Sequence, residues 1–240
     1  ERKRTEKLKE EFISTVSHEL RTPLTSIRGS VGLLTGGLAG EFSDKAKQLL
    51  TIAHNNTERL LMLINDILDL SKIESGKMDF KFNEMSLQPF LAEAINSNQG
   101  YADQHNVQFV LENCADKAKL HADENRLMQV MNNLMSNAAK FAPKGDQIKI
   151  SANRHHQKIR ISVTDHGAGI PKELESKIFD KFTQADSSDT RQVGGTGLGL
   201  NITKAIVEKH NGRIAFVTEP GVGTSFYFDI PELITDSTSK

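Results

Sequence analysis

A histidine beside a carboxylate lies in the segment SHELRTPL, residues 17–24, within a long helical pattern. Helical spacing turns His18 about 200° from the apolar residues two positions before and after it, and so away from the apolar stripe. Glu19 can accept a proton from the imidazole or hold its tautomer, which makes the other ring nitrogen a better nucleophile. Pro23 removes a backbone donor at a cost of roughly 3 kcal/mol and should loosen the helix beyond the histidine. A nucleophilic His18 is one interpretation, and an ordinary exposed histidine is the other.

A second segment with chemical potential is QVMNNLMSNAAKF, residues 129–141. Its apolar residues form one helical stripe, whereas Asn133, Asn137 and Lys140 lie with Gln129 on another side. Asparagine is a poor helix former, so a merely solvated face would favour Glu and Lys instead. Amide oxygens can ligate Mg²⁺, and a lysine ammonium can bind phosphate. The alternative is an ordinary helix with asparagines at a packed edge.

A strand pattern ends at an aspartate in VTDHGAGIP, residues 163–171. The carboxylate of Asp165 can accept a hydrogen bond from an exocyclic amine. Gly167 and Gly169 would let the backbone approach a ring or a phosphate closely. The alternative is a simple glycine turn between a strand and a helix.

The segment GGTGLGL, residues 194–200, leads directly into an apolar helix pattern. Glycines before a helix N-terminus leave bare backbone N–H groups that bind anions. The segment is neither a Walker P-loop nor a dinucleotide fingerprint. The polar stretch 183–193 has no periodicity and is typical of a lid, from which Arg191 could reach a terminal phosphate. A last glycine turn, GVGTSFYF at 221–228, indicates by itself only a structural turn into a strand.

Two long helices must position the histidine. The first carries an apolar stripe that ends at Leu34, before a group of glycines at 36–40. The second runs from an N-cap at Ser43 to Ser75, with Gly76 just beyond its end. Its heptad seam consists of Leu49, Ala53, Asn56, Leu60, Leu63, Ile67 and Leu70, and a second row consists of Leu50, Leu61, Ile64 and Leu68. Two helices alone would leave the second row exposed, so the pattern predicts a hairpin that dimerises into a four-helix bundle.

The sequence changes character after Gly76. Alternating patterns predict strands at 77–82, 107–112, 147–152, 158–163 and 224–230, and helical patterns fall at about 86–99, 123–142 and 197–211. Strands mixed with helices, without strict alternation, indicate an α+β sandwich of a mixed sheet under helices. The expected domains are 1–76 and 77–232, with a polar tail at 233–240.

Composition excludes several classes of protein. Among 240 residues the acidic and basic side chains nearly balance, with a net charge of -1, so nothing indicates a nucleic-acid partner. Cys114 is the single cysteine, which excludes an internal disulfide and suits a reducing compartment. No apolar run approaches the roughly 20 residues needed to span a bilayer. The chain starts at Glu1 in mid-helix, so we expect a fragment of a longer protein, with any membrane anchor upstream.

In this order the segments resemble the catalytic core of sensor histidine kinases of two-component systems. FISTVSHELRTPL resembles the H box, NNLMSNAAKF the N box, DHGAGI the G1 box, FDKF (179–182) the F box, GGTGLGL the G2 box and GVGTSF the G3 box. The resemblance covers about 12–230. It implies a dimerisation and phosphotransfer hairpin followed by a Bergerat-type ATP-binding domain. Departures are mild, because only Ala142 replaces a common threonine and His166 occupies a variable position.

The resemblance implies roles for individual residues. His18 would accept the γ-phosphoryl group of ATP, Glu19 would accept its proton, and Thr22 would orient water when the partner is dephosphorylated. Asn137 would ligate Mg²⁺, Asp165 would bind the adenine amino group, and Phe179 and Phe182 would anchor the lid. The implied ATP-binding residues are Asn133, Asn137, Lys140, Phe141, Asp165, Gly167, Gly169, Ile170, Arg191, Gly195, Thr196, Gly197, Leu198, Gly199 and Thr224.

The expected function is ATP-dependent autophosphorylation of His18, then transfer to an aspartate of a response regulator. The expected location is cytoplasmic, as the soluble part of a sensor that an upstream segment could anchor. Three alternatives remain open: a mainly hydrolytic phosphatase that uses Glu19 and Thr22, a non-catalytic dimeric relay, and an ATPase of the gyrase or mismatch-repair type. The last would not need the His18 hairpin.

Overall fold

The computed structural model describes residues 2–36, 40, 42–183 and 196–233. In the first helix it describes side chains only from Thr15 onward, that of His18 excepted. The chain divides into two compact units. One holds the described residues of 1–78 and of 194–198, and the other holds the rest.

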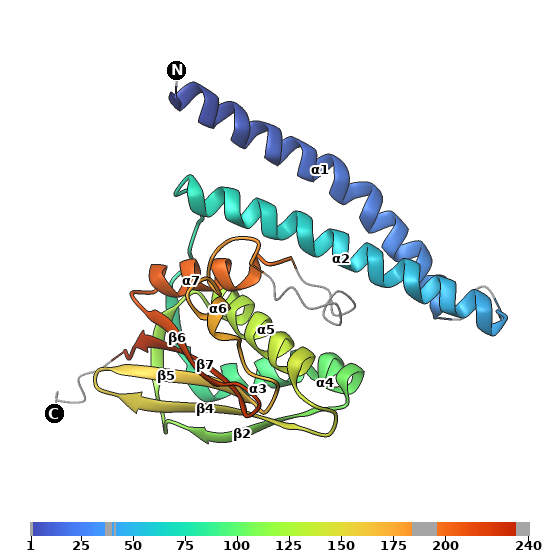
Figure 1. Ribbon diagram of the computed structural model, residues 1–240. Helices are drawn as coiled ribbons and strands as arrows, with labels where there is room; N and C mark the ends of the chain where they lie inside the picture. The colour runs from blue at the N-terminus through green and yellow to red at the C-terminus, as the bar shows by residue number, and fades with distance from the viewer. Residues whose placement is uncertain (1, 37–39, 41, 184–195, 234–240) are drawn as a thin grey trace. The chain divides into compact units, whose positions relative to one another are not determined.

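The first unit is a helical hairpin (Figure 1). Helix α1 (Arg2–Thr35) continues through Pro23, and helix α2 (Asp44–Glu74) begins at the predicted cap, where Ser43 Oγ accepts the N–H of Ala46. Side chains link the helices, because Arg21 donates to Asn65 at 2.9 Å and Arg28 lies 3.7 Å from Glu58.

In α2, the row expected to be buried is mostly exposed, and the row expected to be exposed supplies most of the buried apolar residues. The expected seam is largely exposed, with Leu49, Leu60 and Ile67 at 61%, 46% and 38%. The second row contributes the buried residues Leu61, Ile64 and Leu68. Heptad spacing shows that two rows exist, but the rotation of each helix about its axis decides which row is buried.

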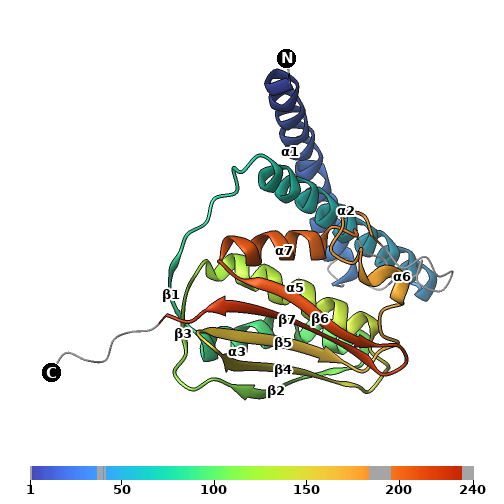
Figure 2. The same cartoon turned by 60° about the vertical axis from the view of Figure 1, so that its left-hand side comes forward.

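The second unit has two layers. Its five-stranded sheet consists of β2 (Gln108–Cys114), β4 (Gln147–His155), β5 (Lys158–Asp165), β7 (Gly223–Pro231) and β6 (Arg213–Glu219), in that order. Only β2 and β4 pair in parallel, so the sheet is mixed, as predicted. Figures 1 and 2 show helices α3 (Leu87–Ser97), α5 (Glu124–Phe141) and α7 (Gly199–Lys209) on one face of this sheet. Alternate residues of β5, such as Ile159 and Ile161, are fully buried beneath them.

Several smaller elements were not anticipated. Strands β1 (Asn83–Ser86) and β3 (Lys119–Ala122) form a separate antiparallel pair, and α6 (Lys172–Glu175) is a single turn. The helix expected at 86–99 is α3 followed by a second short helix, α4 (Gln99–His105). The strand expected at 77–82 is wrong, because these residues form no strand; the backbone N–H of Lys81 donates to the Asp123 carboxylate instead. None of the described helices combines the length and apolarity needed to cross a bilayer.

Candidate functional site

Helix α5 presents the amide row predicted from its sequence. Asp123 caps the helix by accepting the N–H of Arg126, and the apolar stripe, including Leu127 and Leu134, is buried. Asn133 and Asn137 are half-buried on another side, where Nδ2 of Asn137 lies 3.5 Å from Oδ1 of Asn133. The two amides therefore lie at the edge of the packed layer, with their polar atoms next to each other.

Helix α7 begins beside this row. Nδ2 of Asn133 donates to Oγ1 of Thr203 in α7 at 2.7 Å. A Cβ atom added to Gly199 would overlap Oδ1 of Asn133, so only glycine permits this approach. The first turn of α7, whose backbone N–H groups have no partner within the helix, is thereby held against Asn133 of α5. This arrangement suits an anionic group together with a hard cation.

Asp165 ends strand β5 as a buried carboxylate, 6% exposed. Its Oδ1 accepts the backbone N–H of Gly167 at 2.8 Å. Burial raises the pKa of Asp165 above its usual range, and hydrogen bonds from the backbone of Gly167 and Thr224 act in the opposite direction. A buried acceptor of this kind can bind the amino group of a flat ring.

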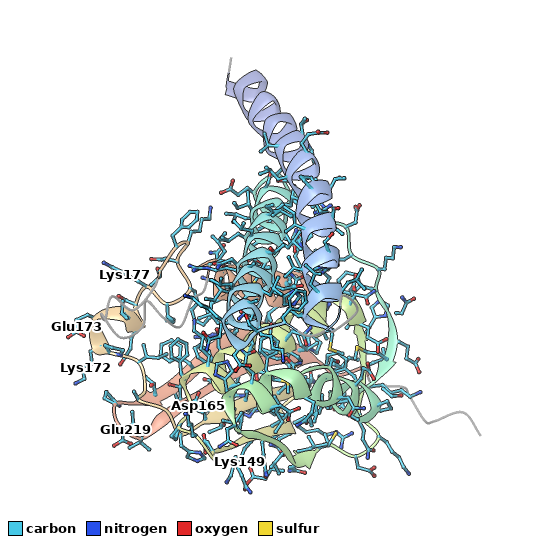
Figure 3. All side chains as sticks on the ribbon, turned by 90° about the vertical axis from the view of Figure 1, so that its right-hand side faces the viewer. Lys149, Asp165, Lys172, Glu173, Lys177 and Glu219 are labelled. Atoms are coloured by element: carbon cyan, nitrogen blue, oxygen red, sulfur yellow. The ribbon has the colours of Figure 1, made fainter. Side chains whose placement is uncertain are left out.

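The loop after Asp165 is packed too closely for side chains at its glycines. A Cβ atom on Gly167 would overlap the carbonyl oxygen of Phe141, at the end of α5. Gly169 has φ +74°, and a Cβ there would lie 2.6 Å from the carbonyl oxygen of Glu219. Asp165 and Glu219, both labelled in Figure 3, lie at the same end of the sheet, opposite Thr224 and Gly223 at the start of β7. These glycines therefore serve close packing of the loop between α5 and the β6–β7 turn.

The β6–β7 turn holds this loop from one side. The N–H of Gly221 donates to Ala168, and the N–H of Ile170 donates to Oγ1 of Thr218, both within 3.0 Å. Thr224, buried beside Asp165 in the sheet register, shares a hydrogen bond with Thr218. The segment 221–228, which by itself indicated only a turn, thus positions the aspartate loop.

Sequence reasoning missed the contact that holds the other side of the loop. Oδ2 of Asp146 accepts the backbone N–H of His166 at 3.0 Å, and Oδ1 lies 2.8 Å from Nδ1 of the same histidine. Asp146 lies between α5 and β4, twenty residues before its partner in sequence. An aspartate directly after Lys144-Gly145 and a histidine directly after Asp165 were the only available signals.

Of the two F-box phenylalanines, Phe179 packs against the sheet and Phe182 does not. Phe179 lies 6.0 Å from the ring of Phe216 and 6.4 Å from that of Phe226, and its carbonyl accepts a hydrogen bond from Asn201 of α7. Phe182 is 66% exposed with φ +61°, so the prediction that it anchors a lid to the core is wrong. Position in a motif did not distinguish the packed ring from the exposed one.

Some of the remaining predicted residues have described side chains, and the others lie outside the described part of the chain. Ile170 is buried, Phe141 is half exposed with the Lys140 ammonium 5.0 Å from its ring, and Leu198 is fully buried after Gly197 at φ +70°. The N–H of Leu198 donates to Oγ1 of Thr196. Arg191 and Gly195 lie outside the described residues. On α1, Glu19 and Thr22 are exposed, and the side chain of His18 is outside the described part.

Comparison with known proteins agrees with this geometry. Residues 8–76 match the His Kinase A (phospho-acceptor) domain, and residues 122–234 match the histidine kinase-, DNA gyrase B- and HSP90-like ATPase family. The chain is 39% identical to the sensor histidine kinase WalK of Bacillus subtilis over 234 residues, covering 96% of this chain and 38% of WalK. It is also 39% identical to the circadian input-output histidine kinase CikA of Synechococcus elongatus over 228 residues, covering 93% of this chain and 30% of CikA.

Solved structures show the same relationship. Full-length ShkA in complex with AMPPNP superposes with a TM-score of 0.75 at 26% identity, over 94% of this chain and 46% of ShkA. The catalytic domain of histidine kinase ThkA superposes with a TM-score of 0.55 at 31% identity, over 63% of this chain and 95% of that domain. The chain therefore spans much less than the full length of WalK, CikA or ShkA. With an H-box hairpin, an ATPase-type sandwich and these relatives, it belongs to the sensor histidine kinase family.

Proposed function

We propose that this chain transfers the γ-phosphoryl group of ATP to His18 and then to an aspartate of a response regulator. One observation supports this most directly. The amide of Asn133 contacts α7 at Gly199 and Thr203, with that of Asn137 beside it, and both lie on the helix whose C-terminal end is next to Gly167 of the Asp165 loop. One domain thus combines acceptors for a cation, donors for phosphates and a buried acceptor for a base.

The proposed ATP site lies along the C-terminal half of α5, from Asn133 to Phe141. Asp165 accepts from the adenine amino group, while Gly167, Gly169 and Ile170 line the ring and Thr224 supports the aspartate. The phosphates lie near Lys140 and the first turn of α7. The residues proposed for that end are Asn133, Asn137, Arg191, Gly195, Thr196, Gly197, Leu198 and Gly199. At Gly167 and Gly199 a Cβ atom would meet Phe141 and Asn133, so these glycines hold the segments proposed to line the site close to α5.

The proposed Mg²⁺ ligand is Asn137. Its neighbour Asn133 is engaged with Thr203, which orients the amide row. A bound Mg²⁺ would neutralise charge on the phosphate oxygens and hold them in one geometry. The protein would supply the half-buried side-chain amide of Asn137, which lies next to Asn133 on α5.

The proposed reaction is an in-line displacement at phosphorus. A ring nitrogen of His18 forms the N–P bond as the bond to the β-phosphate oxygen breaks, and ADP leaves. The ring N–H proton passes to Glu19, which is exposed on α1. In the second step the phosphoryl group moves from the ring nitrogen to a carboxylate oxygen of the regulator as the N–P bond breaks, and the proton held by Glu19 returns to the imidazole.

We propose that the chain works as a homodimer through the hairpin. Val16, Leu20 and Ile27 of α1 are exposed by 36–47%, as are several apolar residues of α2. Soluble monomers rarely leave such a row open, and a second hairpin would cover it in a four-helix bundle. The reaction requires ATP and a receiver partner, so a cytoplasmic location is part of this proposal, and any membrane attachment would come from outside the chain.

A second activity, removal of phosphate from the regulator, is proposed for the same helix. Thr22 is exposed one helical turn after His18, on the same side of α1. A hydroxyl at that position can orient a water molecule towards a partner's acyl phosphate. Thr22→Ala should lower regulator dephosphorylation while preserving His18 labelling, and parallel loss of both activities would contradict a separate role.

The test of the main proposal is transfer of label from γ-³²P-ATP. The wild type should acquire an acid-labile, base-stable label, and His18→Gln should abolish it while the protein still binds an ATP analogue. His156→Asn, a change at an exposed turn histidine in the second unit, is the matched control and should label normally. Persistent label in His18→Gln would contradict the assignment of the phosphoacceptor.

A further inference from the structure

The loop that carries Asp165 has an anchor on the side away from the β6–β7 turn. Both carboxylate oxygens of Asp146 contact one residue, His166, through its backbone N–H at 3.0 Å and its ring Nδ1 at 2.8 Å. The next N–H in the chain, that of Gly167, donates to Asp165 itself. Two consecutive backbone N–H groups are thus held by two carboxylates, one from outside the loop and one from within it.

Asp146 is itself held in place by its surroundings. Its side chain is only 8% exposed, although it carries a carboxylate. Its N–H donates to Pro143, and its carbonyl accepts the N–H of Gln108 at the start of β2. The preceding Gly145 donates to Asn106 at 2.7 Å. The carboxylate therefore fixes the loop after Asp165 relative to α4, β2 and β4.

The charge of Asp146 works against the function of its neighbour. After burial, the leading cause, Asp146 further raises the pKa of Asp165, whereas His166 lowers it. A second carboxylate beside a nucleotide-binding acceptor is thus an electrostatic cost. The two hydrogen bonds that Asp146 accepts from His166, which are stronger for a charged acceptor, oppose this like-charge interaction. A net benefit of Asp146 must therefore come from where it places the loop.

We infer that Asp146 and His166 are a positioning pair that holds Asp165 in the orientation required by an adenine ring. This rests on the proposed ATP site and adds to it two residues that lie outside the glycine motifs. Neither residue needs to touch the nucleotide. The pair acts because a side chain displaced by even a fraction of an ångström makes a poorer hydrogen bond to the base.

The substitutions are chosen by atomic position. Asp146→Ala removes both acceptors, and Asp146→Asn keeps one oxygen, so binding should weaken in the order wild type, Asn, Ala. His166→Asn places an amide nitrogen on Cγ, where the histidine has Nδ1, and should preserve binding. His166→Phe keeps a flat ring without a donor and should weaken it. Glu232→Gln is the control, since Glu232 pairs with Arg154 at the opposite end of the sheet.

The measurement is the dissociation constant of fluorescent ADP and of a non-hydrolysable ATP analogue, with the 240-residue chain well below its unfolding temperature. Asp146→Ala should weaken both nucleotides by the same factor, about tenfold. His166→Phe keeps the backbone N–H contact with Asp146 and should weaken both nucleotides by a smaller factor. The double variant should bind no more weakly than Asp146→Ala alone, because that substitution already removes both contacts. The autophosphorylation rate at saturating ATP should remain unchanged while KM rises.

The outcomes separate the two proposals. If the wild type binds neither nucleotide, both the proposed function and the positioning role of Asp146 and His166 are refuted. If the wild type binds and both single variants bind equally well, the positioning pair is refuted while the proposed function stands. Additive losses in the double variant, or a loss confined to the triphosphate analogue, would also refute it. His166→Asn distinguishes lost contact from misfolding, because failure of this variant to bind while it remains folded contradicts the proposed geometry.

Discussion

The backbone N–H of Asp123 donates to Nε2 of His210 at 3.0 Å, joining the start of α5 to the end of α7. Nδ1 of the same ring lies 2.8 Å from the carbonyl oxygen of Ile206, so the proton belongs on Nδ1 and the imidazole is neutral. The carboxylate of Asp123 meanwhile accepts the N–H of Lys81 at 2.7 Å. One buried histidine thus helps to hold together the two helices that form the proposed phosphate site.

This histidine should make folding stability depend on pH. Burial lowers the pKa of His210 below its usual range, and the Ile206 carbonyl and Asp123 act in the opposite direction. The unfolded chain therefore takes up the proton first as pH falls. Stability should be fully present above the ordinary histidine pKa of about 6.5 and decline below it, by at most about 1.4 kcal/mol per pH unit.

The measurement is denaturant unfolding of the wild type and His210→Gln at pH 7.5 and pH 5.5. The variant should be less stable at the higher pH, because it loses a buried hydrogen-bond partner. The difference in free energy of unfolding between the two proteins should be smaller at pH 5.5, because there the wild type is destabilised by keeping the ring of His210 neutral. A gap that stays constant or widens on acidification would show that His210 is not held neutral.

Gly199 should be intolerant of alanine for a steric reason. The added Cβ would displace the Asn133 side chain and break its hydrogen bond to Thr203. We expect ATP-analogue affinity to fall by at least about tenfold, since loss of one buried hydrogen bond costs on the order of 1–3 kcal/mol. Gly100→Ala is the matched control in the same unit, because a Cβ there meets nothing within 4 Å. Equal binding by both variants would contradict the close approach.

The free energy of unfolding of Asp165→Asn should increase relative to that of the wild type as pH rises. Burial raises the pKa of the carboxyl, so its ionised form is a cost that is absent below about pH 3.8 and complete above the raised pKa. The same substitution should weaken adenine binding, because it removes the charged acceptor. Unfolding at pH 4 and pH 7, with ADP titration at pH 7, tests both halves. A variant that becomes relatively less stable towards pH 7 would reverse the predicted sign.

The exposed row of α2 should control association. Leu60→Gln with Ile67→Gln removes two large apolar groups that are 46% and 38% exposed, so the chain should become monomeric. Nucleotide binding by the second unit should persist. Thr51→Gln, at an exposed polar position of the same helix, is the control and should leave the dimer intact. Sedimentation velocity of the three proteins checks this, and a dimeric double variant would place the interface elsewhere.

Sequence alone determined the features that local periodicity and residue chemistry encode. The Ser43 cap, the two long helices, the amide row of α5 and the main strands follow from spacing and from backbone preferences that operate within a few residues. Asp165 and its glycines also fitted a simple turn between a strand and a helix, and they were identified through the resemblance of DHGAGI to the G1 box. These signals are strong because each lies within one element.

Tertiary structure decided everything that depends on a partner distant in sequence. The alternation at 77–82 predicted a strand, but Phe80 and Phe82 pack against His210 and the backbone finds a carboxylate in place of a neighbouring strand. Which row of α2 is buried depends on helix rotation, which heptad spacing leaves open. The contact between Asp146 and His166 exists only because β4 and β5 pair in one register. Hydrogen bonds and burial need two partners, and a sequence pattern shows only one of them.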